Sequence, residues 1–321
     1  MRLAVIAVVW LIAAIAGVAI ESDYLVSVAT AMAFLGLWAQ SWNVLSGLTG
    51  NISLGHSVFV AVAAYVTVIL HQNGISPLLG GVLGVVAAVV LAAIIGAATL
   101  RLRGPYFTLA TLSAAAVLLS LILHYSDLTG GPSGIAITFA HDSPLELEFT
   151  NVRAYYLIAT TLLAAVTMFI SLIRNSRLGF YVAAIKGSEE VAAAAGVHVA
   201  LIKVTVFCIS AALTALGGVV YVFFIGFADP NFLSGLTLSI QIALTAVVGG
   251  TGYLIGPIIG AICYEGLDAA ANAAFGAAGG WDVMILGFAV VAIVLTEPRG
   301  LCEMAVRLAR ATVGRMRSAA A

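Results

Sequence analysis

The sequence predicts an all-α fold: a polytopic inner-membrane helical bundle of about 8–10 transmembrane helices. Hydrophobic residues make up 63% of the 321 residues and charged residues only 8%, with a mean hydropathy of +1.16. Soluble domains carry about 25% charged residues, so a soluble fold is excluded. No Asp, Glu, Lys or Arg occurs between Tyr24 and Leu100, a stretch long enough for several spans. The net charge of −1 argues against a nucleic-acid partner and leaves the lipid bilayer as the main surroundings.

Polar and glycine-rich breaks divide the chain into candidate spans. They cover residues 3–20, 24–46, 54–71, 78–100, 105–124, 154–173, 204–226, 236–249, 254–271 and 281–296. The first is expected to be a retained helix and not a signal peptide, because no convincing cleavage site precedes Glu21. The segments 236–249 and 254–271 are short, and the sequence leaves open whether they cross the bilayer completely.

The basic residues predict the orientation. Twelve of the 13 Lys and Arg residues fall in four regions: Arg2, the Arg101/Arg103 pair, the segment 174–203 and the tail from Arg299 onward. Even numbers of spans separate these regions, so the positive-inside rule predicts that all four, and both termini, are cytoplasmic. Only Arg153 falls on the other side. The organisation expected is a single transmembrane domain, residues 1–300, followed by a basic cytoplasmic tail, 301–321.

Two glycine-rich breaks interrupt the spans, at residues 47–55 and 249–252. Glycine within membrane helices indicates either close helix packing or a break that lines a cavity. Interrupted segments in both halves of a chain favour a transport pathway. His56 either contacts that pathway or is bonded to a neighbouring helix. The tentative pathway residues are Gly50, Ser53, Gly55 and His56.

Carboxylates at mid-depth are the usual relays of proton- or ion-coupled transport. The acidic residues Asp229, Glu265, Asp268 and Asp282 are all expected near the outer ends of their spans. The sequence therefore disfavours such coupling.

Two loops carry further signals. In 174–203, Ser188 is expected to cap a short helix that has Glu189 and Glu190 in its first turn and ends at Gly196. Its small alanine face suits docking in a groove of another protein, although packing on its own bundle is the alternative. In the opposite loop, 125–152, apolar residues alternate around positions 135–139 and 145–149, which predicts an extracytoplasmic hairpin. That hairpin would either receive a soluble partner or cover the helices.

The sequence contains no motif for catalysis or for a metal. Its lysines, Lys186 and Lys203, both lie outside a GxxxxGK[ST] phosphate loop, and Cys208, Cys263 and Cys302 are far apart. We expect no enzyme activity, no metal and no cofactor in this chain. If ATP drives it, another subunit must bind and hydrolyse the ATP.

Residues 41–59, SWNVLSGLTGNISLGHSVF, resemble a stretch of LivM-type permeases, the membrane subunits of branched-chain amino acid ABC importers. Further matches occur in order and with the spacing of that family, which also includes urea permeases. They are LRGPYFTLATL at 102–112, TGGPSGI at 129–135, SRLG at 176–179 with AI, E-x-A and G after it, and VGGTG at 248–252 with GP after it. Phe180, Tyr181 and Gly187 depart from the family pattern, which is more basic there.

The resemblance implies a permease that works with a second homologous permease, ABC ATPase subunits and an extracytoplasmic substrate-binding protein in the inner membrane. The segment 174–203 would then be the coupling loop that contacts an ATPase. Its coupling residues would be Lys186, Glu189, Glu190, Ala193 and Gly196. The expected cargo is a branched-chain or other hydrophobic amino acid, and urea or a short-chain amide is the alternative. A secondary transporter or channel acting alone is the competing class, and a structural subunit is a third.

Overall fold

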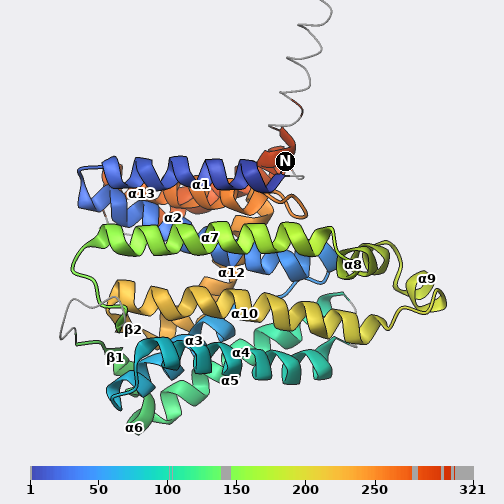
Figure 1. Cartoon of the computed structure of the whole chain (residues 1–321), viewed down its shortest axis with the longest axis horizontal. Helices are drawn as coiled ribbons and strands as arrows, with labels where there is room; N and C mark the ends of the chain where they lie inside the picture. Colours follow the sequence, from blue (N-terminus) through green and yellow to red (C-terminus); the bar gives the residue numbers. More distant parts are fainter. Residues whose placement is uncertain are drawn as a thin grey trace, which may run out of the picture.

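The computed structural model describes residues 2–100, 102, 104–138, 146–276, 281–297, 300–304 and 307. Long helices run roughly alongside one another (Figure 1). They are α1 (Arg2–Ala19), α2 (Asp23–Trp42), α3 (His56–Gln72), α4 (Pro77–Thr99), α5 (Pro105–His124), α7 (Val152–Arg174), α10 (Val199–Ile225), α12 (Leu236–Gly249), α13 (Gly256–Phe275) and α14 (Trp281–Thr296). Each predicted span corresponds to one of these helices, so the helical-bundle prediction is confirmed.

Short elements occupy the two ends of the bundle and the connections. They are η1 (Asn43–Gly47, a π-helix), α6 (Ser126–Thr129), η2 (Gly131–Ser133), β1 (Ile135–Ala136), α8 (Arg177–Gly187), α9 (Glu189–Ala194), β2 (Phe227–Ala228) and α11 (Pro230–Leu233). We call the end of the bundle that carries α8 and α9 the coupling end, and the end with β1 and β2 the sheet end (Figure 1). Arg101, Arg103, Phe139, Leu145 and most of the tail 301–321 lie outside the described residues.

The bundle consists of two groups of helices joined by α2 and α10. In one group α3, α4 and α10 pack together, and in the other α2 contacts α7 and α13 while α1 lies along α7. Aromatic rings fill the junction: Phe34 and Trp38 of α2 contact Tyr221 of α10, with ring centroids 5.3 and 5.0 Å apart. The buried core is therefore centred on α2.

Five helical stretches in the described part of the chain are long and apolar enough to cross a membrane. They are 23–47, 77–99, 105–124, 152–174 and 199–225, and shorter apolar helices cover 6–19, 56–72 and 236–249. The exposed sides of α1 and α4 are aliphatic: Ile12 is 62% exposed and Val82 is 62% exposed. Such surfaces match hydrocarbon and not water.

The first strand of the predicted hairpin is observed as β1, and residues 139–145, which would form its turn, lie outside the described residues. β1 pairs antiparallel with β2, with Ile135 opposite Ala228, so a strand of the loop joins the segment that follows α10. Tyr65 of α3 donates its hydroxyl to the Ala228 carbonyl at 3.1 Å and anchors this sheet. The alternation read from the sequence located β1 correctly, but its partner is distant in sequence and could not be found from local pattern.

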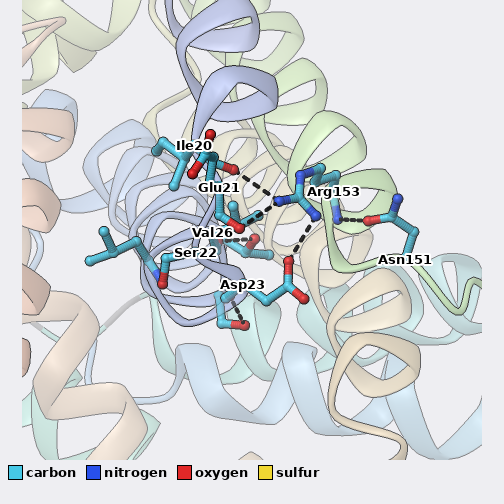
Figure 2. Close-up of polar contacts among 10 residues, drawn as sticks. Ile20, Glu21, Ser22, Asp23, Val26, Asn151 and Arg153 are labelled. Carbon is cyan, nitrogen blue, oxygen red and sulfur yellow. Dashed lines mark hydrogen bonds and ion pairs between the residues drawn. The ribbon is translucent and has the colours of Figure 1, made fainter.

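Arg153, the cationic residue that the positive-inside rule predicts at the outer side, fastens the α1–α2 turn to α7 (Figure 2). Its Nη1 lies 2.7 Å from Asp23 Oδ1, and its Nη2 donates to the carbonyls of Ile20 at 2.9 Å and Glu21 at 3.0 Å. The Asn151 side chain caps α7 by accepting from the Arg153 N–H at 2.9 Å. The positive charge of Arg153 is thus bound by groups of the sheet end itself.

Candidate functional site: the two breaks and the coupling segment

The first break separates α2 from α3 and contains the predicted pathway residues. After η1 the chain leaves the helix at Gly50, whose φ of +82° suits glycine, and re-enters a helix at His56. A Cβ on Gly55 would lie 2.5 Å from the Thr111 carbonyl of α5, so that position also requires a glycine. Gly50 is exposed, whereas Ser53, Gly55 and His56 are buried.

His56 bridges three segments and is fully buried. Its Nδ1 lies 3.2 Å from Ser53 Oγ and its Nε2 lies 2.8 Å from Ser210 Oγ on α10. Ser210 donates its one hydroxyl proton to the Ser41 carbonyl at 2.6 Å. Nε2 must therefore carry the imidazole proton, and Nδ1 accepts from Ser53. Of the two roles considered for His56, bonding to a neighbouring helix is the one the structure shows.

Helix α5 covers the first break. The Thr108 hydroxyl donates to the Ile52 carbonyl at 2.8 Å, and the Leu54 N–H donates to the Thr111 hydroxyl at 3.1 Å. The residues of this loop that reach the surface, such as Ile52 at 52% exposed, therefore lie beside α5.

The second break meets the first. The side-chain amide of Asn43 accepts from the Gly252 N–H at 2.9 Å and donates to the Tyr253 carbonyl at 3.0 Å. Gln40 donates to the Leu254 carbonyl at 2.6 Å. These two amides were not selected from the sequence, although polar side chains within a long apolar stretch are the signal that could have identified them.

Two cations tie the breaks to the coupling end. Lys186 of α8 donates to the Gly47 carbonyl at 2.7 Å, and Arg174 at the end of α7 donates to the Gly252 carbonyl. Both line a cavity of about 220 Å³, together with Leu48 and Gly179. Lys186, predicted to contact an ATPase, therefore also holds the carbonyl end of η1.

The short helix predicted in the coupling segment is confirmed as α9. Ser188 caps it by accepting from the Val191 N–H at 3.3 Å, and Gly196 follows with a φ of +86°. Glu189 pairs with Lys203, which is 1% exposed and lies within α10, a helix that begins at Val199 and not at 204. The outward face of α9 carries Glu190, Val191, Ala193 and Ala194, all exposed, and the C-cap residue Ala195 is exposed as well. A helix before it, α8, was not predicted.

The position of Glu265 differs from the expectation that it lies near the outer end of its span. It is the tenth of the twenty residues of α13, so its place is the middle of the helix and not the outer end. Gln241 of α12 donates to its Oε1 at 3.3 Å, and Asp268 follows one turn later. The predicted span ended at residue 271, whereas α13 continues to Phe275, four residues further at the outer end. The shorter span placed Glu265 too close to that end.

The fold defines a multi-pass helical membrane protein whose helices are interrupted at two breaks. Residues 24–294 match the family model described as the permease component of the branched-chain amino acid transport system. The permease LivM of the high-affinity branched-chain amino acid system of Escherichia coli K12 is 26% identical over 82% of this chain and 66% of its own length. LivH of the same organism is 26% identical over 83% of this chain and 90% of its own. The fructose import permease FruG of Bifidobacterium longum is 26% identical over 87% of this chain and 80% of its own. No solved structure gave a significant match.

The chain belongs to the branched-chain amino acid transport system permease family, the LivM-type permeases of ABC importers. It is a multi-pass protein of the inner membrane, and the family is a transport component and not a catalytic one. It spans slightly less than two thirds of the length of LivM.

Proposed function

We propose that the chain is the membrane permease of an ATP-driven importer for branched-chain amino acids. The similarity to LivM supports this cargo, and the family match supports the transport role. FruG has the same 26% identity, so a fructose-like sugar is the second candidate that the relatives favour. Urea and short amides remain candidates from the sequence resemblance.

The observation that carries the proposal is the position of α9. It projects past the ends of the long helices at the coupling end (Figure 1), with Val191 68% exposed on its outer face. A solvent-exposed valine beside small alanines is a surface that a partner groove can cover. Separate ATPase subunits are the proposed occupants of this surface, since the chain contains no phosphate-binding loop.

A second permease is the proposed partner for α5. Ser113 and Ser120 lie on its exposed side, and His124 is exposed at its outer end. The serine hydroxyls donate to their own helix at 2.9 Å, to the carbonyls of Leu109 and Ala116. Polar groups on a membrane helix face protein or water in preference to lipid. The pathway is therefore proposed to run along α5 beside the Gly50–Ile52 loop, between the two permeases.

The sheet end is the proposed delivery side. β1, β2, α6 and α11 gather there, and an extracytoplasmic binding protein would release its ligand onto this surface. The single permease domain of residues 1–300 and the basic tail 301–321 complete the proposed organisation.

The test begins with purification of the chain from its native membrane in mild detergent and identification of its partners by mass. Reconstituted liposomes should then take up labelled leucine with ATP, and unlabelled valine should compete. Competition by fructose, urea or acetamide in place of valine would assign a different cargo. Uptake without ATP by the chain alone would contradict the proposal and support a channel or secondary carrier.

Two variants of α9 test the ATPase surface. Glu190→Lys and Ala193→Trp change exposed side chains, so membrane insertion should be normal while ATP-dependent uptake falls at least about tenfold. The matched control is Val9→Trp, which adds the same bulk to the aliphatic side of α1, where the valine is 59% exposed. Normal uptake in both α9 variants would rule out this surface.

A further inference from the structure

A buried ion pair links the coupling segment to the core of the bundle. Glu189 is the first residue of α9, and its carboxylate pairs with the ammonium group of Lys203. The Lys203 side chain is 2% exposed and the Glu189 side chain 32% exposed. Lysine is almost never fully buried unless it is paired, and removal of the partner of a buried charge is costly. α9 is therefore attached firmly to the first turns of α10.

α10 connects the Glu189–Lys203 ion pair to the first break. It is one uninterrupted helix, and Ser210 lies seven residues beyond Lys203, which is about 10 Å along the axis. Ser210 contacts both sides of the break: its hydroxyl donates to the Ser41 carbonyl of α2 and accepts from His56 at the start of α3. A displacement of Lys203 along the helix axis must move Ser210 with it, because a hydrogen-bonded helix transmits axial motion nearly rigidly.

A second, shorter link reaches the same break from α8. Lys186 donates to the Gly47 carbonyl, the last residue of η1. The break is thus held at Ser41, at Gly47 and at His56 by elements that continue directly from the coupling segment. The α2–α3 loop between these points is the part of the break that reaches the surface beside α5.

We propose that Glu189–Lys203 and Ser210–His56 are the two ends of a relay in which α10 transmits movement of α9 to the break between α2 and α3. Lys203 and Ser210 are positioning residues, since neither reaches the surface along which cargo would move. This inference rests on the proposed function, because it takes an ATP-driven partner to be what moves α9.

The relay is tested in the purified complex with its partner subunits, reconstituted in liposomes. Lys203→Met and Ser210→Ala should each lower the number of solute molecules imported per ATP hydrolysed by about tenfold, while the ATPase rate stays within about twofold of wild type. The charge exchange Lys203→Glu with Glu189→Lys should restore part of the ratio. Matched controls lie on the same helix: Thr205→Ala and Thr214→Ala remove hydroxyls that donate to the carbonyls of α10 itself, Leu201 and Ser210, and should leave the ratio unchanged.

A second readout does not depend on the cargo. Ile52→Cys, in a chain whose Cys208, Cys263 and Cys302 are changed to Ala, places a thiol on the exposed part of the break. Its reaction rate with a membrane-impermeant maleimide should change when ATP and vanadate are added, and Lys203→Met or Ser210→Ala should abolish that change. If the thiol responds but leucine is not imported, the cargo assignment fails and the relay stands.

Two outcomes would overturn the relay. One is an unchanged ratio of import to ATP hydrolysis in both Lys203→Met and Ser210→Ala. The other is a nucleotide response at residue 52 that survives both substitutions. Absence of any response in the wild-type complex would contradict the relay and the proposed ATP-driven function together.

Discussion

Asn43 holds Gly252 across the bundle: its Oδ1 accepts the Gly252 N–H at 2.9 Å, and its Nδ2 reaches the next carbonyl, that of Tyr253, at 3.0 Å. One side chain thereby joins two breaks that are more than 200 residues apart in sequence, at a site where Asn43 is 3% exposed. The two groups that Asn43 pairs, the Gly252 N–H and the Tyr253 carbonyl, are backbone groups outside the regular helices. Since lipid and core offer no substitute partner, the amide stabilises the interruption between α12 and α13.

Asn43→Leu should therefore destabilise the protein strongly. Each of the two backbone groups left unpaired costs about 1–3 kcal/mol, so a clear fall in the melting temperature of the detergent-solubilised protein is expected. The control is Asn73→Ala, which removes an amide that bonds its own helix at the exposed end of α3. A melting temperature lowered equally by both substitutions would contradict the role assigned to Asn43.

Gly47→Ala tests the same junction by adding volume. The new Cβ would lie 1.8 Å from Asn43 Oδ1 and 3.0 Å from the Gly252 nitrogen, so the amide must move away from the second break. Overpacking of this kind costs about 1–3 kcal/mol and should again lower the melting temperature. Gly187→Ala is the matched control, because nothing lies within 4 Å of the position its new methyl group would take and α8 gains a better helix former.

The sequence predicted the helices well because membrane spans depend on local composition. Long apolar stretches between glycine-rich breaks define each helix, and α5, α12 and α14 have the predicted bounds. The sequence predicted the capped helix α9 equally well, since Ser188 and the acidic first turn are local signals. What local pattern could not supply was pairing between distant segments.

The unpredicted contacts that connect the two breaks to each other and to the coupling end span long sequence separations. The bonds from Asn43 to Gly252, from Ser210 to Ser41 and from Lys186 to Gly47 join residues more than 100 positions apart. Lys203 was assigned to a cytoplasmic loop because its charge outweighed the apolar residues before it. Its pairing with Glu189 neutralises that charge and lets α10 begin at Val199.

Arg153→Leu should loosen the attachment of α1 at the sheet end. The guanidinium contributes two bonds to backbone carbonyls and an ion pair with Asp23, whose side chain is 71% exposed. An exposed ion pair contributes about 0–1 kcal/mol, whereas hydrogen bonds from a charged donor contribute about 1.5–3 kcal/mol each. Arg153→Leu should therefore lower the melting temperature much more than Asp23→Asn. Equal effects of the two substitutions would show that the ion pair, and not the carbonyl contacts, is what matters.

Glu265→Gln separates an ATP-driven importer from a proton-coupled carrier. Glu265 lies at the middle of α13, the place where a proton relay would need a carboxylate, yet its Oε1 accepts from Gln241, a bond that a glutamine oxygen can also accept. If ATP supplies the energy, import by Glu265→Gln should stay within about twofold of wild type, because the structural hydrogen bond remains. Asp268→Asn, one turn away, is the matched control for loss of a negative charge in α13. Import should also persist when a protonophore collapses the proton gradient while ATP is maintained. Loss of import in Glu265→Gln alone, together with sensitivity to the protonophore, would instead establish Glu265 as a proton carrier and reject the ATP-driven mechanism.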